Sequence, residues 1–166
     1  LGRWRNIVAC YQPRFERYTE LAGQLGWLLG PDAAPDEHAQ KMLAKNSDAG
    51  AWLAQVADLV EGLALPPSPP GDRSAHDAAV ALPTAAEGVT PPEPVVTLPD
   101  GRELLTPVGL EAKVKELASE QSWKIGKLMA PLRAAITGTN KGPGIWDSAF
   151  LIGKEWLLRR LRSVGG

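Results

Sequence analysis

Basic and aromatic side chains alternate along residues 123–162, the stretch whose residue types are best suited to chemistry. It holds eight basic residues and three tryptophans: Lys124, Lys127, Arg133, Lys141, Lys154, Arg159, Arg160 and Arg162, with Trp123, Trp146 and Trp156. Basic groups neutralise phosphates and release counterions, and aromatic faces stack on unpaired bases. Two interpretations remain open on composition alone, a nucleic-acid surface or a solvated helix face with tryptophans in the core.

The formal net charge of −1 conceals an uneven distribution along the chain. Residues 1–30 carry a net +2, residues 31–100 a net −8 and residues 101–166 a net +5. Such asymmetry is informative about partners rather than about fold. The near-zero total therefore does not exclude a nucleic-acid partner for the C-terminal part.

Other chemistry finds little support in the sequence. The two histidines, His38 and His76, and the single cysteine, Cys10, cannot assemble a zinc site with ordinary spacing, and no glycine-rich phosphate loop occurs. We therefore predict no catalytic residue and no metal in this chain. A lone cysteine excludes an intramolecular disulfide and favours a cytoplasmic protein. No apolar run approaches the roughly 20 residues that span a bilayer, so no membrane partner is expected.

Apolar spacing predicts helices in the N-terminal third of the chain. One is expected on each side of Pro13, and a short polar helix is expected from Pro35 to about Lys45. Ser47 is the predicted N-cap of a further helix. Its predicted inward face consists of Trp52, Val56, Leu59, Val60 and Leu63.

Residues 66–99 hold nine of the fifteen prolines, which predicts an insertion or linker without long regular elements. At its end, the turn sequence Pro99-Asp100-Gly101 predicts a short β-hairpin within residues 95–105.

The C-terminal part is predicted to be helical again. Thr106 is the expected N-cap of a helix with Pro107 at its first position, and a stripe of Leu110, Val114, Leu117 and Ala118. Further helices are expected over 128–136, from residue 145, and over 154–162, with Gly138 and Gly153 at their boundaries. The predicted fold is an all-α helical bundle of two small subdomains, 1–65 and 101–166. The proline-rich acidic insertion, 66–100, and one short hairpin would lie between them.

The segment from Trp123 to Gly138, Trp-Lys-Ile-Gly-Lys-Leu-Met-Ala-Pro-Leu-Arg-Ala-Ala-Ile-Thr-Gly, resembles a C-terminal signature of bacterial-type glutamyl-tRNA synthetases. The family pattern K-x-G-K-x-x-x-P-L-R-x-A-L-T-G is followed by x-P-G, by L-G-K-E and by an Arg-Leu ending. This chain continues with Gly142-Pro143-Gly144, then Ile152-Gly153-Lys154-Glu155, then Arg160-Leu161. Residues 11–29 also look like the helix that opens the family's anticodon-binding part. Residues 104–122 loosely fit the helix that precedes the signature in that family.

The resemblance implies an all-helical anticodon-binding region behind a class I Rossmann catalytic domain that uses ATP and Mg. Motifs of the H-I-G-H and K-M-S-K-S kinds are missing from this chain. The chain would therefore contain no cofactor site and should be inactive alone. It begins at Leu1 rather than Met, which we interpret as a piece of a longer ligase whose catalytic domain lies upstream.

The resemblance also implies which residues approach the anticodon. By position these are Arg133, Gly142 and Ile145, and we add Lys141, Trp146, Arg14 and Arg17. Arg133 could instead form an ion pair with Asp147 or Glu155, and Trp146 could belong to the core. Gly142 lacks the side chain often found at its position in the family. The remaining basic residues Lys154, Arg159 and Arg160 could neutralise phosphates or form a basic helix end.

The expected function is recognition of the tRNA(Glu) anticodon stem-loop by a monomeric glutamate–tRNA ligase, supporting ATP-dependent aminoacylation. The alternative is a helical protein–protein interaction module whose proline-rich stretch 66–70 forms a polyproline II ligand.

Overall fold

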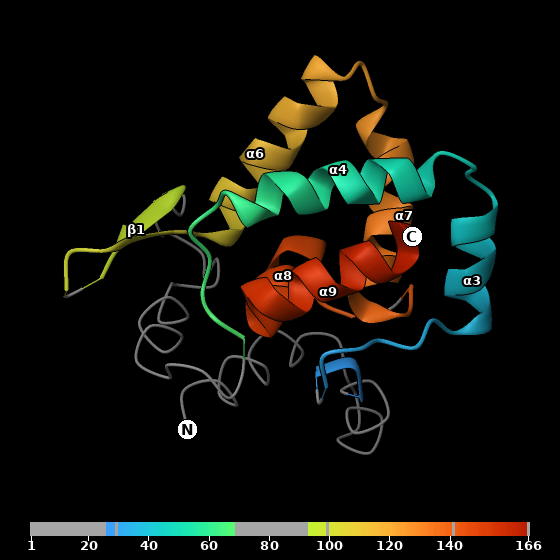
Figure 1. The fold of residues 1–166 in the computed structure, drawn as a ribbon, viewed down its shortest axis with the longest axis horizontal. Coiled ribbons are helices and arrows are strands. Elements are labelled where there is room, and N and C mark those ends of the chain that lie inside the picture. Colours follow the sequence, from blue (N-terminus) through green and yellow to red (C-terminus); the bar gives the residue numbers. More distant parts are fainter. Residues whose placement is uncertain (1–25, 29, 69–92, 99, 141, 166) are drawn as a thin grey trace, which may run out of the picture.

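A computed structural model describes residues 26–28, 30–68, 93–98, 100–140 and 142–165, which form a mainly α-helical fold with one short hairpin (Figure 1). The elements within these ranges are η2 (Gly26–Leu28), α3 (Glu37–Ala44), α4 (Ala49–Glu61), β1 (Val95–Thr97), β2 (Glu103–Leu105), α6 (Pro107–Glu120), α7 (Ile125–Thr137), α8 (Ile145–Ile152) and α9 (Lys154–Gly165). This confirms the predicted fold class. The helices predicted on either side of Pro13 lie outside the described residues. None of the described helices is long and apolar enough to cross a bilayer.

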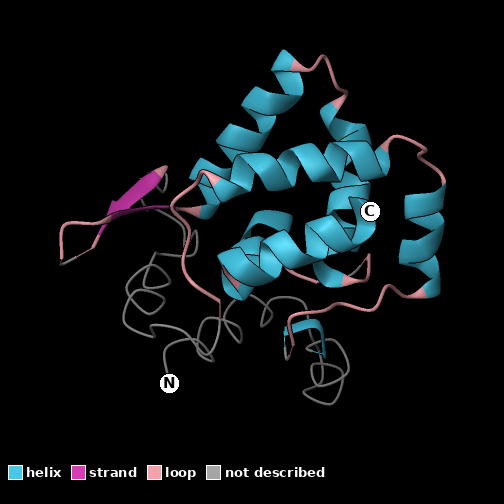
Figure 2. Ribbon diagram, in the orientation of Figure 1, coloured by secondary structure: helices cyan, strands magenta, loops and turns pink. Residues whose placement is uncertain are grey.

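The helices surround one core that is shared by segments on both sides of the proline-rich stretch. α4 packs most extensively against α9, and the two lie side by side in Figure 1. Helix α3 stands at one edge and the hairpin projects from the opposite edge (Figure 2). The largest buried apolar side chains of this core come from α4, α6, α7, α8 and α9: Leu53, Val56, Leu110, Leu128, Leu132, Ile136, Ile152, Leu157 and Leu161. Burial of each such side chain contributes about 1.5–3 kcal/mol.

Among the described helices, two starts are capped by a side chain, and one of these caps, Thr106, was predicted. The Thr106 side chain accepts a hydrogen bond from Gly109 N (3.2 Å), with Pro107 at the first helical position, as predicted. The Asp36 carboxylate accepts from Ala39 N (2.7 Å) at the start of α3. Strands β1 and β2 pair in antiparallel register, with Val96 opposite Leu104, which confirms the hairpin.

Helix α4 differs from the prediction in both its start and its inward face. Its N-cap is Asp48 rather than Ser47, because a turn in which Ala49 N donates to Asn46 O (3.0 Å) precedes the helix. The buried face consists of Ala49, Leu53, Val56, Ala57 and Val60, whereas the expected Trp52, Leu59 and Leu63 are only half-buried. Val56 and Val60 are buried as predicted, and the three half-buried side chains still pack against the core, so the face is centred on Leu53 instead of on Trp52. Helix α9 is the element that α4 packs against most extensively.

Helix α7 begins at Ile125, three residues before the predicted start, and carries Pro131 in its interior. An interior proline removes one helical hydrogen bond and costs about 3 kcal/mol. Here Leu128, Pro131, Leu132 and Ala135 recur at helical spacing and are all buried. Their burial on one face offsets the cost and allows the helix to continue through the proline.

Both ends of the proline-rich stretch pack against helix N-termini. Pro66 O accepts from Lys154 N (2.8 Å), and the Ser68 hydroxyl accepts from Trp156 N (2.8 Å), so residues 66–68 cap α9. In return, Ser68 N donates to the Glu155 carboxylate (2.6 Å). Gly153, with a φ of +76°, permits this approach, because a Cβ there would lie 2.6 Å from Pro67.

At the other end of that stretch, Thr106 holds two backbone carbonyls. Thr106 N donates to Pro94 O (3.0 Å), and its hydroxyl donates to Glu93 O (2.7 Å). The residues that flank 69–92 are therefore parts of the fold. Pro66 and Ser68 are buried, so the first half of the predicted polyproline ligand is covered by α9 rather than displayed.

We predict that the cap between Ser68 and Glu155 makes stability depend on acid pH. Burial raises the pKa of Glu155, but the hydrogen bonds from Ser68 and from its own backbone N–H, with the nearby charge of Lys154, together hold that pKa below its ordinary value of 4.5. Glu155 therefore stabilises the fold above pH 4.5, and this contribution is lost as the pH falls through the lowered pKa. Because the side chain is partly exposed, we expect Glu155→Gln to cost about 0.5 kcal/mol at pH 7.

Urea unfolding at pH 7 and at pH 3.5 measures this difference. The gap between the unfolding free energies of the wild type and Glu155→Gln should narrow at the lower pH. Glu120→Gln, at an exposed position at the end of α6, is the matched control and should show no such change. An equal gap at both pH values would contradict the prediction.

Candidate nucleic-acid interface

The turn that joins α7 to α8 gathers the described members of the predicted contact set. Arg133 lies in the last part of α7, Gly142 lies in the turn, and Ile145 and Trp146 open α8. The other three predicted contact residues, Arg14, Arg17 and Lys141, lie outside the described residues.

Backbone geometry fixes where this turn begins. Helix α7 ends at Gly138, whose φ of +68° is the left-handed conformation that glycine adopts most readily, as predicted. A Cβ on Gly138 would lie 2.6 Å from Ala34 O, and Gly138 O accepts from Asp36 N (2.8 Å). The start of α3 is therefore docked directly against the end of α7.

Hydrogen bonds from the last part of α7 hold both sides of the turn. Arg133 Nη1 donates to Pro143 O (2.8 Å), which ties the guanidinium to the residue before Gly144. The Thr137 hydroxyl donates to Arg133 O (2.9 Å) and accepts from Thr139 N (3.3 Å). Arg133 is half-buried, and the predicted alternative partner Glu155 is engaged with Ser68 instead. The structure thus gives Arg133 a definite role in shaping the turn.

The two apolar residues predicted to face bases lie against the protein core. Ile145 is 6% exposed and belongs to the core cluster, whereas Trp146 is half-buried and packs against it. Trp146 also lines a small apolar void together with Leu110, Leu132 and Leu157. The Ile145 side chain therefore presents little surface to a ligand, and the surface at this point is formed largely by the turn itself.

A carboxylate lies over the N-terminus of α8. A Cβ built on Gly144 would be 2.3 Å from Asp147 Oδ2, so the Asp147 side chain folds back toward the start of the helix. An acidic side chain in the first turn is stabilised by the helix dipole. The Asp147 carboxylate therefore occupies the helix end at which a phosphate would otherwise bind.

Most of the basic residues on α9 are engaged within the protein. Lys154 Nζ donates to Glu61 O and Leu63 O (both 2.8 Å) and so covers the C-terminus of α4. Arg159 forms a two-point ion pair with Asp32 (2.7 and 2.8 Å), and Arg162 pairs with Glu61 (2.6 Å). The sequence left two roles open for Lys154, phosphate neutralisation and a role at a helix end. The structure shows a helix-end role, because Lys154 caps the C-terminus of α4.

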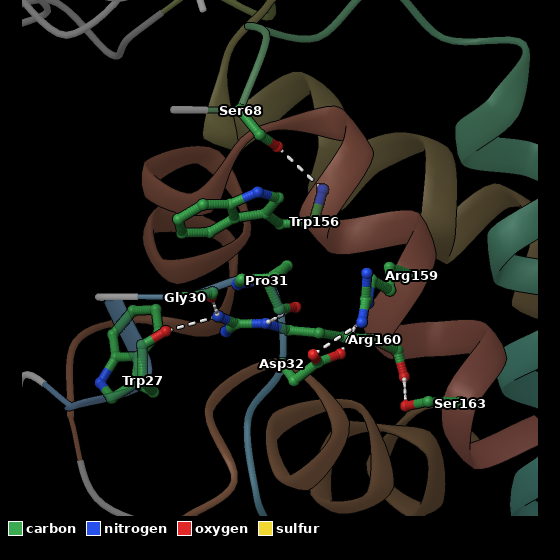
Figure 3. A network of polar contacts seen from close by, with 9 residues as sticks. All are labelled: Trp27, Gly30, Pro31, Asp32, Ser68, Trp156, Arg159, Arg160 and Ser163. Atoms are coloured by element: carbon green, nitrogen blue, oxygen red, sulfur yellow. Dashed lines mark hydrogen bonds and ion pairs between the residues drawn. The ribbon is translucent and has the colours of Figure 1, made fainter. Parts of the chain in front are cut away.

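Arg160 is the largest fully buried side chain of the described residues and is 1% exposed. Among the described residues, its guanidinium donates to the backbone carbonyls of Trp27, Gly30 and Pro31 (Figure 3) and to that of Ile136. Because the guanidinium is buried, a phosphate cannot reach it. The possibility that Arg160 neutralises a phosphate is therefore wrong. The sequence did carry a signal, because Arg160 lies three residues after Leu157 and four before Val164, on the apolar stripe of α9.

Two lysines at the opposite end of α7 remain exposed. Lys124 and Lys127 take part in no ion pair among the described residues. Beside them, the rings of Trp123 and Trp52 lie 5.7 Å apart between centroids and are both half-buried. Among the described cations of the stretch 123–162, these two are the best placed to meet an external anion.

Metal chemistry finds no support in this part of the molecule. Within the described ranges, no group of three or more His, Cys, Asp or Glu side chains could hold a metal ion.

Comparison with known proteins finds similarity in the C-terminal region of the chain. The family described as "Anticodon binding domain" matches residues 100–164. The chain is 43% identical over 60 residues to a glutamate–tRNA ligase of Thermus thermophilus, which is 36% of this chain and 13% of that protein. It is 39% identical over 62 residues to a glutamate–tRNA ligase of Bacillus subtilis, covering 37% and 13% respectively.

A third relative, glutamate–tRNA ligase 2 of Novosphingobium aromaticivorans, is 47% identical over 53 residues, which is 32% of this chain. These matches span only 11–13% of the relatives' own lengths. They agree with the resemblance found in the segment from Trp123 onward. Residues 100–164 of this chain thus match the family described as "Anticodon binding domain", and part of the chain is similar to a segment of glutamate–tRNA ligases.

Proposed function

We propose that this chain recognises the anticodon stem-loop of tRNA(Glu) through the turn between α7 and α8. The observation that carries the proposal is the match of residues 100–164 to the anticodon binding domain, together with the rigidly held turn inside that range. The chain would act within a monomeric, cytoplasmic glutamate–tRNA ligase. A catalytic domain upstream, which uses ATP and Mg, would perform the aminoacylation, and this chain alone would be inactive.

The turn suits unpaired bases better than phosphates. Gly142 has no side chain, so a base can approach the main chain at this point of the turn. The Asp147 carboxylate at the start of α8 repels phosphates but can accept hydrogen bonds from base amino groups. Beside the turn, the planar guanidinium of Arg133 can stack on a base or donate to its edge.

Phosphate neutralisation would fall to cations away from the turn. Lys124 and Lys127 lie at the N-terminal end of α7, about 20 Å along a 13-residue helix from Gly138. Lys141, Arg14 and Arg17 are further candidates from the sequence. In this arrangement the turn reads bases, and these basic residues hold the backbone of the stem-loop.

The first prediction concerns salt dependence and selectivity. The chain should bind tRNA(Glu), and the logarithm of its affinity should fall linearly with the logarithm of salt concentration, by about 0.7–0.9 per phosphate contact. A tRNA(Glu) transcript with a substituted anticodon should bind more weakly at every salt concentration, with the same slope. Fluorescence anisotropy titrations measure both quantities. Equal affinity for the two transcripts would refute the proposal.

The second prediction concerns Arg133. Arg133→Ala should lower the discrimination between the two transcripts by about 1–3 kcal/mol, because the guanidinium shapes the turn and contacts a base. Arg133→Lys should lose most of the same discrimination, because an ammonium group keeps the charge but not the planar fork.

Lys113→Ala is the matched control for Arg133, since it removes one exposed charge from α6. It should leave the discrimination unchanged. Circular dichroism establishes that each variant is folded before titration. If Arg133→Ala discriminates between the two transcripts as well as the wild type does, Arg133 takes no part in recognition.

A further inference from the structure

The guanidinium of Arg160 is enclosed by carbonyl groups from two distant parts of the chain. Its Nε donates to Pro31 O (3.0 Å), and its Nη2 donates to Trp27 O (2.5 Å) and Gly30 O (2.6 Å). Its Nη1 donates to Ile136 O, in the last turn of α7. Figure 3 shows the guanidinium between the segment 27–32 and Trp156.

Within the part of the chain that the structure describes, this cage keeps a buried charge without a carboxylate directly bonded to it. The nearby Asp32 carboxylate is paired with Arg159. The rings of Trp27 and Trp156 have their centroids 5.9 and 6.0 Å from Arg160 Cζ, close enough for weak cation–π attraction. Burial lowers the pKa of Arg160 to about 10, so the group remains charged at neutral pH.

The bond to Ile136 O connects this cage to the turn. Ile136 precedes the last residue of α7, and the final carbonyls of a helix have no partner within the helix. They also carry the negative end of the helix dipole, which a cation stabilises. Without the guanidinium, the buried carbonyl of Ile136 would lack a hydrogen-bond donor, which costs free energy. The last turn of α7 would lower this cost by moving toward water.

A shift of that last turn would displace the turn between α7 and α8 at two points. Gly138, two residues after Ile136, carries the left-handed conformation that starts the turn and the contact with Asp36. Arg133, three residues before Ile136, holds Pro143. The position of Ile136 O therefore decides where both supports of the turn lie.

We infer that Arg160 is a positioning residue for anticodon recognition: it holds the end of α7 in the register that shapes the turn, and it couples that turn to residues 27–32. The inference rests on the proposed function, since the turn is taken as the anticodon contact. Arg160 itself touches no tRNA, because its side chain is buried.

Arg160→Lys tests the inference, because one ammonium group keeps the charge but cannot bond to all four carbonyls. Below the melting temperature of the variant, its preference for tRNA(Glu) over the anticodon-substituted transcript should fall at least tenfold. Its affinity for the substituted transcript should stay within twofold of the wild type, since the exposed cations are unchanged.

Two neighbours on α9 provide matched controls. Leu161→Ala removes a fully buried core side chain next to Arg160 and should lower thermal stability without changing the preference. Arg159→Ala removes the exposed neighbouring guanidinium and should leave the preference within twofold. If Arg160→Lys behaves like Leu161→Ala, losing stability but keeping the wild-type preference, Arg160 has a structural role only and the inference is overturned.

A second variant serves if Arg160→Lys does not fold. Trp156→Leu leaves the guanidinium in place but opens one side of the cage to water, and should reduce the preference about threefold. A wild-type preference in the folded Trp156→Leu variant would then overturn the inference.

Amide hydrogen exchange separates a failure of this inference from a failure of the proposed function. In Arg160→Lys, the amides of Gly138 and Thr139 should exchange at least tenfold faster than in Leu161→Ala at equal overall stability. If the wild type does not distinguish the two transcripts, the proposed function fails, and this comparison alone decides whether Arg160 positions the turn. Equal exchange rates in the two variants would overturn the inference.

Discussion

The buried guanidinium of Arg160 satisfies backbone carbonyls that no local element can satisfy. It bonds to three carbonyls of the segment 27–31 and to one at the end of α7, and it lies on α9. A buried carbonyl without a donor costs about 1–3 kcal/mol, and hydrogen bonds from a charged donor are stronger than neutral ones. Through these bonds, one side chain on α9 joins Trp27, Gly30 and Pro31 to the end of α7.

The same principle explains other residues of the C-terminal signature. Lys154 covers the last carbonyls of α4, and Glu155 binds the backbone of Ser68, whose hydroxyl caps the start of α9. Gly138 and Gly153 allow Ala34 and Pro67 to approach where a Cβ would collide. In this structure, these residues of the signature from Gly138 to Arg160 join helix ends to other segments of the chain.

Because many basic residues form contacts within the protein, fewer of them are available to contact a nucleic acid. Arg159, Arg160, Arg162 and Lys154 are engaged within the protein, so the net positive charge of the C-terminal part overstates the charge offered to a ligand. What faces outward is a glycine-containing turn beside Arg133 and Asp147, with Lys124 and Lys127 at the far end of α7. Such a surface suits recognition of bases by shape and hydrogen bonding, supported by a few phosphate contacts.

The sequence by itself determined the features that depend on a few consecutive residues. Thr106 with Pro107 begins α6, the Pro-Asp-Gly turn makes the hairpin, and Gly138 ends α7, because capping and backbone dihedral preferences are local properties. The C-terminal motif likewise resembled the family whose model matches residues 100–164. The sequence did not show that Ile145 would face the core.

Only the tertiary structure decided the rest. The buried face of α4 is centred on Leu53 instead of on Trp52, and α9 is the element that it packs against most extensively. The cap from Ser68 to Glu155 joins residues 87 positions apart, and the bond from Arg160 to Pro31 joins residues 129 apart. A sequence pattern shows that a basic residue lies on an apolar stripe, but not which distant carbonyls it will meet. That choice is made by packing, because a buried charge is stable only where the fold brings acceptors to it.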